Sequence, residues 1–180
     1  MFYFELMELN RKILITTSMV FVAAFSRLLP HPPNFTPMIS IALFSGAVIV
    51  SRPMALIIPL LAMFASDIFL GFHSLQPVVY ASILLISVSG MFINEHHRFL
   101  KVTGYSVSGS LFFFFITNSA VWMFSGMYSP GISGLLSSLV MGLPFLTNTL
   151  LSSLLYSAVL FGSFHFLENR KVFQVSAASR

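Results

Sequence analysis

The chain has 180 residues, of which 57% are hydrophobic and only 8% are charged. Because a soluble domain carries roughly a quarter charged residues, this composition argues against a soluble fold, a disordered chain and a nucleic-acid-binding protein. It indicates a single transmembrane domain over residues 1–180, and the absence of cysteine excludes disulfides, thiolate catalysis and cysteine metal sites. We interpret the net charge of +4 as a sign of orientation in the bilayer rather than of an anionic partner.

The first apolar run, residues 13–29, follows a basic pair at residues 11–12, an order that is also found in signal peptides. The run ends in Arg27, two leucines and a proline, which is not a small-residue cleavage site. We therefore interpret it as a membrane span. The sequence leaves open whether translation starts at Met1 or at Met7.

Six segments are predicted to be transmembrane helices, since a span needs about 20 mostly apolar residues, within a range of about 17–25. They are residues 13–29, 37–50, 54–70, 77–93, 102–124 and 144–167. The cluster of prolines at 30–33 ends the first span, and Pro59 is expected to kink the third. Residues 131–142 are predicted to form a short outer helix, and residues 168–180 a cytoplasmic tail. The count falls to five if the short second segment does not cross.

The basic residues test this count independently, because they concentrate in cytoplasmic segments. With the N-terminus inside, the inner segments hold eight of the nine basic residues, namely Arg11, Lys12, Arg52, Arg98, Lys101, Arg170, Lys171 and Arg180. The outer segments hold only Arg27. The partition predicts an all-α membrane protein with both termini in the cytoplasm.

Polar and aromatic side chains lie at a similar depth in the outer halves of the predicted spans and in the loops that join them. They comprise one cation, one acid, amides, imidazoles and aromatic rings. An apolar cleft with a few convergent polar groups is typical of a ligand pocket. The sequence therefore predicts an outward-facing binding pocket. Its candidate ligand-binding residues are Arg27, His31, Asn34, Asp67, His73, Asn118, Trp122, Tyr128 and Asn148.

Asp67 is the one acid inside a predicted span, and an unpaired carboxylate in lipid costs at least about 2.5 kcal/mol. It is expected to face the bundle interior, either paired with Arg27 for structure or in contact with a ligand. Arg27 has the alternative of extending to the lipid headgroups.

The other polar residues of this layer also have structural alternatives. Asn118 is equally suited to an interhelical hydrogen bond. Trp122 and Tyr128 suit an interfacial aromatic belt. Any one of these residues is a weak signal, and the pocket hypothesis depends on their convergence.

The sequence carries no motif of an enzyme. It lacks a phosphate-binding Walker loop, a His-Glu-x-x-His zinc motif and a Gly-x-Ser-x-Gly nucleophile turn. The run Glu95-His96-His97 is a poor metal site, because adjacent residues of a helix do not face the same way. We therefore expect no catalytic residue, no bound metal and no cofactor.

The chain resembles a family of small bacterial six-helix transport proteins, and through them the substrate-binding S components of energy-coupling factor transporters. The resemblance extends over about residues 13–165. It is carried by the strings RLLPHPPNFTP (27–37), SDIFLGFH (66–73), TNSAVW (117–122) and LPFLTNTL (143–150).

This resemblance implies a protein of the bacterial cytoplasmic membrane that binds a vitamin-like micronutrient from outside and helps to import it. It also implies a partner, a transmembrane coupling subunit driven by two ATPases. The paired alanines with which S components dock are absent, so action without that partner stays open. The alternative function is a structural or assembly protein of the membrane that transports no ligand.

Overall fold

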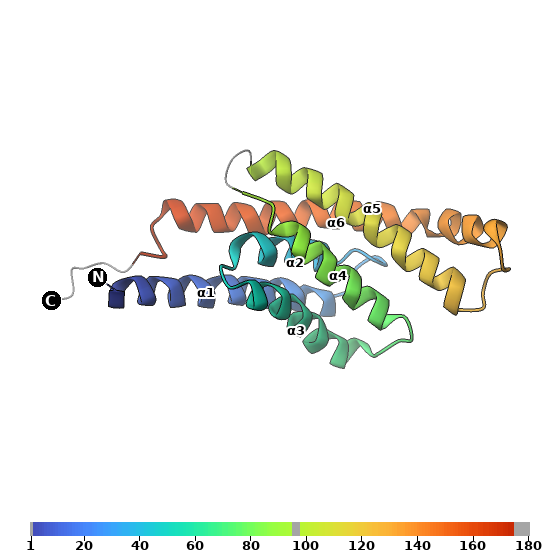
Figure 1. Ribbon diagram of the computed structural model, residues 1–180, viewed down its shortest axis with the longest axis horizontal. Helices are drawn as coiled ribbons and strands as arrows, with labels where there is room; N and C mark the ends of the chain where they lie inside the picture. Colours follow the sequence, from blue (N-terminus) through green and yellow to red (C-terminus); the bar gives the residue numbers. More distant parts are fainter. Residues whose placement is uncertain (1, 95–97, 175–180) are drawn as a thin grey trace.

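The computed structural model describes residues 2–94 and 98–174, and in these ranges it is all-helical, with six α-helices and no strand. The helices are α1 (Phe2–Phe25), α2 (Met38–Val48), α3 (Arg52–Leu70), α4 (Gln76–Gly90), α5 (Arg98–Phe124) and α6 (Ile132–Asn169), with a short 3-10 turn at Ser26–Leu28. They form an elongated bundle with both ends of the chain at the same end (Figure 1). The run Glu95-His96-His97 and Arg180 lie outside the described residues.

Three of the helices, α3, α5 and α6, are long and apolar enough to cross a membrane. The other two apolar helices are shorter, since 11 residues of α2 extend about 17 Å and 15 residues of α4 about 22 Å. The hydrocarbon core of a bilayer is about 30 Å thick. Over the described residues the protein is thus all-α, with three helices that have the length and apolar composition of membrane spans, and the count of six spans stays a prediction.

The short helix α2 lies in the middle of the bundle and is apolar on all faces, as expected for a helix surrounded by protein. Its Phe44 is fully buried and meets the edges of the Phe161 and Phe164 rings of α6 at centroid distances of 5.3 and 5.7 Å. On its other side, Gly46 and Gly90 bring the backbones of α2 and α4 together, because a Cβ at Gly46 would overlap the carbonyl oxygen of Ser87. The predicted second span therefore forms a central helix of the bundle, and its crossing of the membrane stays a prediction.

The predicted break between an outer helix at 131–142 and a span at 144–167 is wrong. One continuous helix of 38 residues, α6, covers both, with Pro144 inside it. Proline removes one backbone hydrogen bond, a loss that long apolar helices tolerate when their neighbours pack against the site. At about 57 Å, α6 exceeds the thickness of a bilayer, and its first turns extend with the end of α5 beyond the other helices (Figure 1).

The interior of the bundle also holds a group of serines from three helices. The hydroxyls of Ser110 and Ser153 are 2.8 Å apart, and those of Ser106 and Ser157 are 2.9 Å apart. Ser157 also donates to the Ser40 hydroxyl at 3.1 Å. All five side chains are buried, and their hydrogen bonds join α2, α5 and α6 within the bundle.

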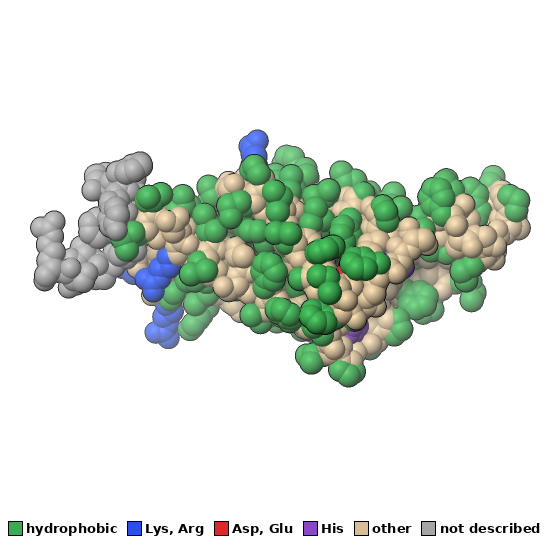
Figure 2. Space-filling view, turned by 90° about the horizontal axis from the view of Figure 1, so that it is seen from below, with side chains coloured by type: hydrophobic (Ala, Val, Ile, Leu, Met, Phe, Trp, Pro, Cys, Tyr) green, Lys and Arg blue, Asp and Glu red, His purple; other side chains and the backbone are tan. Residues whose placement is uncertain are grey.

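Basic residues that are distant in the sequence meet at the end of the bundle that holds the termini. Glu168 of α6 pairs with Lys12 of α1 at 3.8 Å and with Arg98 of α5 at 3.2 Å. Arg11 donates to the carbonyl of Gln174 at 3.3 Å. On the face drawn in Figure 2, lysine and arginine occupy the half nearer the termini and histidine the other half. We call the end of the bundle away from both termini the distal end.

Candidate functional site

The distal end is organised around an ion pair between Arg27 and Asp67. Arg27 lies in the 3-10 turn after α1, and Asp67 lies in the last turn of α3. The Nη1 atom of Arg27 is 2.8 Å from Oδ1 of Asp67, and it also donates to the hydroxyl of Ser66. The Asp67 side chain is 6% exposed and that of Arg27 is 14% exposed, so the pair is largely withdrawn from solvent. The prediction that Asp67 faces inward and pairs with Arg27 is confirmed.

The second oxygen of Asp67 is satisfied by α4. Oδ2 accepts hydrogen bonds from Nε2 of Gln76 at 2.6 Å and from the hydroxyl of Tyr80 at 2.8 Å. Gln76 and Tyr80 are four residues apart and therefore share one face of α4. A buried charge is tolerated when it is both paired and hydrogen-bonded, and Asp67 meets both conditions.

Local structure explains how these side chains meet. The chain leaves helical geometry at Leu29, which ends the 3-10 turn and places Arg27 at the rim of the bundle. Helix α3 ends at Gly71, whose φ of 92° favours glycine and whose amide donates to the Asp67 carbonyl. The loop from Gly71 then returns the chain to α4, so that Gln76 faces back toward Asp67.

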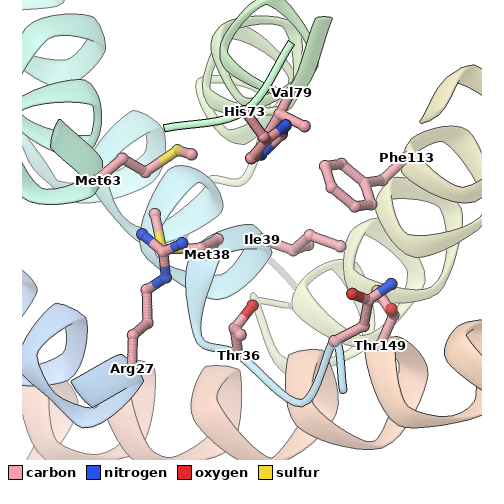
Figure 3. Close-up of a pocket in the computed structure, with 10 residues that line it drawn as sticks. Arg27, Thr36, Met38, Ile39, Met63, His73, Val79, Phe113 and Thr149 are labelled. Carbon is pink, nitrogen blue, oxygen red and sulfur yellow. The ribbon is translucent and has the colours of Figure 1, made fainter. Parts of the chain in front are cut away.

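A cavity of about 160 Å³ opens beside this ion pair, and we call it the Arg27 cavity. Arg27, Thr36, Met63, His73 and Phe113 approach it from different elements of the bundle (Figure 3). The full lining is Arg27, Asn34, Thr36, Met38, Ile39, Met63, His73, Val79, Phe113 and Thr149. Asn34 and His73 are exposed, so the cavity opens toward the distal surface.

A second, wider cavity of about 390 Å³, here the Asn118 cavity, adjoins the first. The two share Asn34, His73, Val79 and Phe113. Beyond these residues, the second cavity is lined by Leu75, Thr117, Asn118, Val121, Met127, Tyr128, Met141, Gly142 and Phe145. It lies between the projecting α5–α6 pair and the loop that follows α3. We call the two adjoining cavities together the hollow of the distal end.

Five of the nine predicted binding residues line this hollow, namely Arg27, Asn34, His73, Asn118 and Tyr128. Asp67 lies behind Arg27 and lines neither cavity. The structure thus brings most of the predicted layer together, while the role of each residue in ligand binding stays a prediction.

The other three predicted residues have local structural contacts instead. His31 is exposed and its Nδ1 lies 2.6 Å from the Leu29 carbonyl. Trp122 donates to the Ser129 carbonyl at 3.1 Å, which ties α5 to the following loop. Asn148 donates to the Pro33 carbonyl at 2.9 Å, which ties the loop after α1 to α6. Each holds an element that borders the hollow.

Sequence reasoning missed several polar residues of the site. Gln76 and Tyr80 could have been found as a polar pair at helical spacing behind the loop that carries His73. Thr36 and Thr149 gave no such signal, because a threonine in an apolar segment usually bonds to its own helix. The packing of α2 against α6 brings Thr36, just before α2, and Thr149 of α6 to the same cavity.

The residues of the site do not form a metal centre. Within residues 2–94 and 98–174, no three His, Asp or Glu side chains are close enough together to hold a metal ion. The cavity lining combines hydrogen-bond donors with apolar side chains, an arrangement suited to holding a small organic solute.

Comparison with known proteins gives a family and no function. Residues 7–176 match a family of unknown function, DUF6580. The chain belongs to this family. No match was found among curated proteins, and none among solved structures.

Proposed function

We propose that this DUF6580 protein is a multi-pass protein of the bacterial cytoplasmic membrane that binds a small, vitamin-like solute and takes part in its uptake. In this proposal six helices traverse the membrane region, both termini are cytoplasmic and the distal end faces outward. The solute occupies the Arg27 and Asn118 cavities. The protein either docks on a transmembrane coupling subunit with two ATPases or acts alone.

The observation that carries the proposal is the hollow at the distal end, formed by two adjoining cavities. It adjoins a largely buried ion pair and opens to the surface at Asn34 and His73. Its walls come from helices α2 to α6 and from the turn after α1, so a ligand there would contact most of the bundle. A site of this kind couples ligand binding to helix packing, which is what a transport protein requires.

The charge distribution supports the orientation. Lys12, Arg98 and Glu168 meet at the terminal end, whereas Arg27 at the distal end is neutralised by Asp67. Under the positive-inside rule, the end rich in basic residues is cytoplasmic. The hollow then faces the side from which nutrients arrive.

A structural or assembly role is the second candidate, and the ion pair itself favours it. Asp67 has three partners from other elements and needs no ligand for its charge to be satisfied. In that case the polar layer holds the helices together and the hollow holds only water.

A solute panel separates these two functions. The purified chain is heated in detergent with single micronutrients from a panel of vitamins and related compounds, and we expect one of them to raise the unfolding temperature. Val79→Trp places a large ring at a position that lines both cavities and is expected to abolish that shift. Val159→Trp, at a position that is 52% exposed on α6, is the matched control and should keep it. If no compound shifts the wild type, the assembly role is favoured.

Cysteine labelling tests the orientation without background, because the chain has no cysteine of its own. Ser74→Cys lies in the exposed loop after α3, and Lys171→Cys lies just after α6. In intact cells an impermeant maleimide should label Ser74→Cys and spare Lys171→Cys until the membrane is opened. The reverse pattern would contradict an outward-facing hollow.

A further inference from the structure

The guanidinium of Arg27 has hydrogen-bonding capacity that the protein does not use. A guanidinium carries five N–H donors in a planar fork. The bonds of Arg27 to Asp67 and Ser66 both run through Nη1. Its Nε is buried and has no hydrogen-bond partner among the described residues. One edge of the fork therefore holds Asp67, and the edge that includes Nε is left for another acceptor.

Asp67 cannot serve this second edge. Its Oδ1 faces Nη1 of Arg27, and its Oδ2 is held by Gln76 and Tyr80 of α4. These contacts fix the carboxylate on the α3–α4 side of the guanidinium. An acceptor for the remaining donors has to come from elsewhere, and Arg27 is one of the residues that line the Arg27 cavity (Figure 3).

The polar residues around the cavity favour a ligand that accepts hydrogen bonds. No carboxylate lines it, whereas His73, Asn34 and Thr36 carry groups that can donate; the hydroxyl of Thr149 already donates to the Phe145 carbonyl. An acidic ligand group would therefore meet Arg27 without facing a like charge across the cavity. A cationic ligand group would meet the guanidinium with no anion in the lining to offset the repulsion.

The remaining walls set the size and polarity of the rest of the ligand. Met38, Ile39, Met63, Val79 and Phe113 give the cavity an apolar side. Its volume of about 160 Å³ is close to that of apolar protein cavities of about 150 Å³ that bind benzene. The cavity thus fits one compact apolar or aromatic group, and a larger ligand would extend into the Asn118 cavity.

We infer that the solute held in the Arg27 cavity is a small carboxylate with a compact apolar or aromatic body. Its carboxylate bonds to the unused edge of Arg27, and its body packs against the methionines and Phe113. This inference rests on the proposed function and names the class of its solute. Asp67 then acts as a positioning residue, which holds the guanidinium so that its unused edge meets the cavity.

Benzoate and benzamide provide the test, because they have nearly the same shape and differ in charge. Binding of each to the purified full-length chain in detergent is measured by titration calorimetry, with sodium chloride as the ionic-strength control. Charge-assisted, two-point hydrogen bonds to arginine are strong, so we expect benzoate to bind at least about tenfold more tightly than benzamide. Benzoate should also raise the unfolding temperature more than benzamide does.

A paired variant shows whether Arg27 is responsible. Arg27→Gln alone would leave Asp67 buried without its counter-ion and risk unfolding. The double variant Arg27→Gln with Asp67→Asn keeps a neutral, hydrogen-bonding pair. We expect it to fold and to lose the preference for benzoate over benzamide. Arg52→Gln, which removes an exposed arginine at the other end of α3, should keep the preference.

Three results would overturn the inference: equal affinities for the two probes, no binding of benzoate, or an undiminished preference in the double variant. None of these results contradicts the proposed function, which allows solutes of other chemistry. The proposed function fails on its own test, in which no solute of the panel stabilises the protein. The two failures are therefore distinguishable.

Discussion

The Oδ1 atom of Asp67, in the last turn of α3, lies 2.8 Å from Nη1 of Arg27, in the turn that follows α1. This contact joins the turn after α1 to the end of α3, beside the cavity that Arg27 lines. Arg27 therefore has two roles, one in the ion pair and one in the lining of the hollow. Variants of Arg27 and Asp67 separate these roles, because the first affects the stability of the fold and the second affects the affinity for the solute.

Asp67→Asn is expected to destabilise the protein by about 3 kcal/mol, because it leaves the largely buried Arg27 charge without its counter-ion. Unfolding is followed in detergent with and without the stabilising solute. If the pair is purely structural, the loss is the same in both conditions, and if Asp67 positions Arg27 for the solute, the loss is larger with solute present.

The double variant Arg27→Gln with Asp67→Asn should recover part of that stability, because the two residues are in direct contact and their effects are not additive. Arg52→Gln is the control for removal of an arginine charge. Wild-type stability in Asp67→Asn would show that the ion pair contributes nothing to the fold.

Tyr80→Phe tests the second support of Asp67. It removes a hydroxyl that donates to Oδ2 of Asp67 and accepts from Gln76, and we expect a loss of about 1–2 kcal/mol in the free energy of unfolding. Tyr105→Phe, a half-buried tyrosine outside this network, is the matched control and should change stability little. Equal effects of the two variants would argue that Asp67 does not need Tyr80.

Gly46→Ala tests the close approach of α2 and α4. The added methyl group would overlap the Ser87 carbonyl, so the helices must separate, at a cost of about 1–3 kcal/mol. Gly162→Ala on α6 meets no atom within 4 Å and is expected to be neutral or stabilising by up to about 1 kcal/mol. Thermal unfolding of the two variants in the same detergent measures the difference, and similar values would contradict the packing of α2 on α4.

Ser157→Ala tests the buried serines. The Ser157 hydroxyl bonds to Ser106 and Ser40, so its removal leaves buried hydroxyls with fewer partners and should cost about 1–2 kcal/mol. Ser137→Ala, on the exposed face of the same helix, should stay within about 0.5 kcal/mol of the wild type. Chemical unfolding in detergent separates these values, and an unchanged Ser157→Ala protein would make the hydroxyl network dispensable.

Much of the architecture follows from local sequence properties. Long apolar segments and the scarcity of charge predict helices in a bilayer, because only a structure that satisfies its own backbone hydrogen bonds is stable there. The pairing of Asp67 with Arg27 was also predictable. A carboxylate in an apolar segment needs a partner, and few basic residues lie at the same predicted depth in the membrane. These conclusions need only the type and order of the residues.

The continuity of α6 through Pro144 is a tertiary property. Proline and glycine at 142–144 predict a break, but the packing of α5 and neighbouring elements along α6 outweighs the loss of one hydrogen bond. The same is true of α2, whose length alone predicts a short span. Its position in the centre of the bundle depends on glycine contacts with α4 and on the rings of α6.

The sequence by itself therefore determined the class of protein, the apolar helical segments and the level at which polar groups gather. The tertiary structure decided which of those groups meet, because a cavity is formed by side chains that different helices bring together and its lining depends on helix rotation and crossing. Thr36 and Thr149 line the Arg27 cavity for this reason, whereas His31, three residues from Asn34, lines neither cavity.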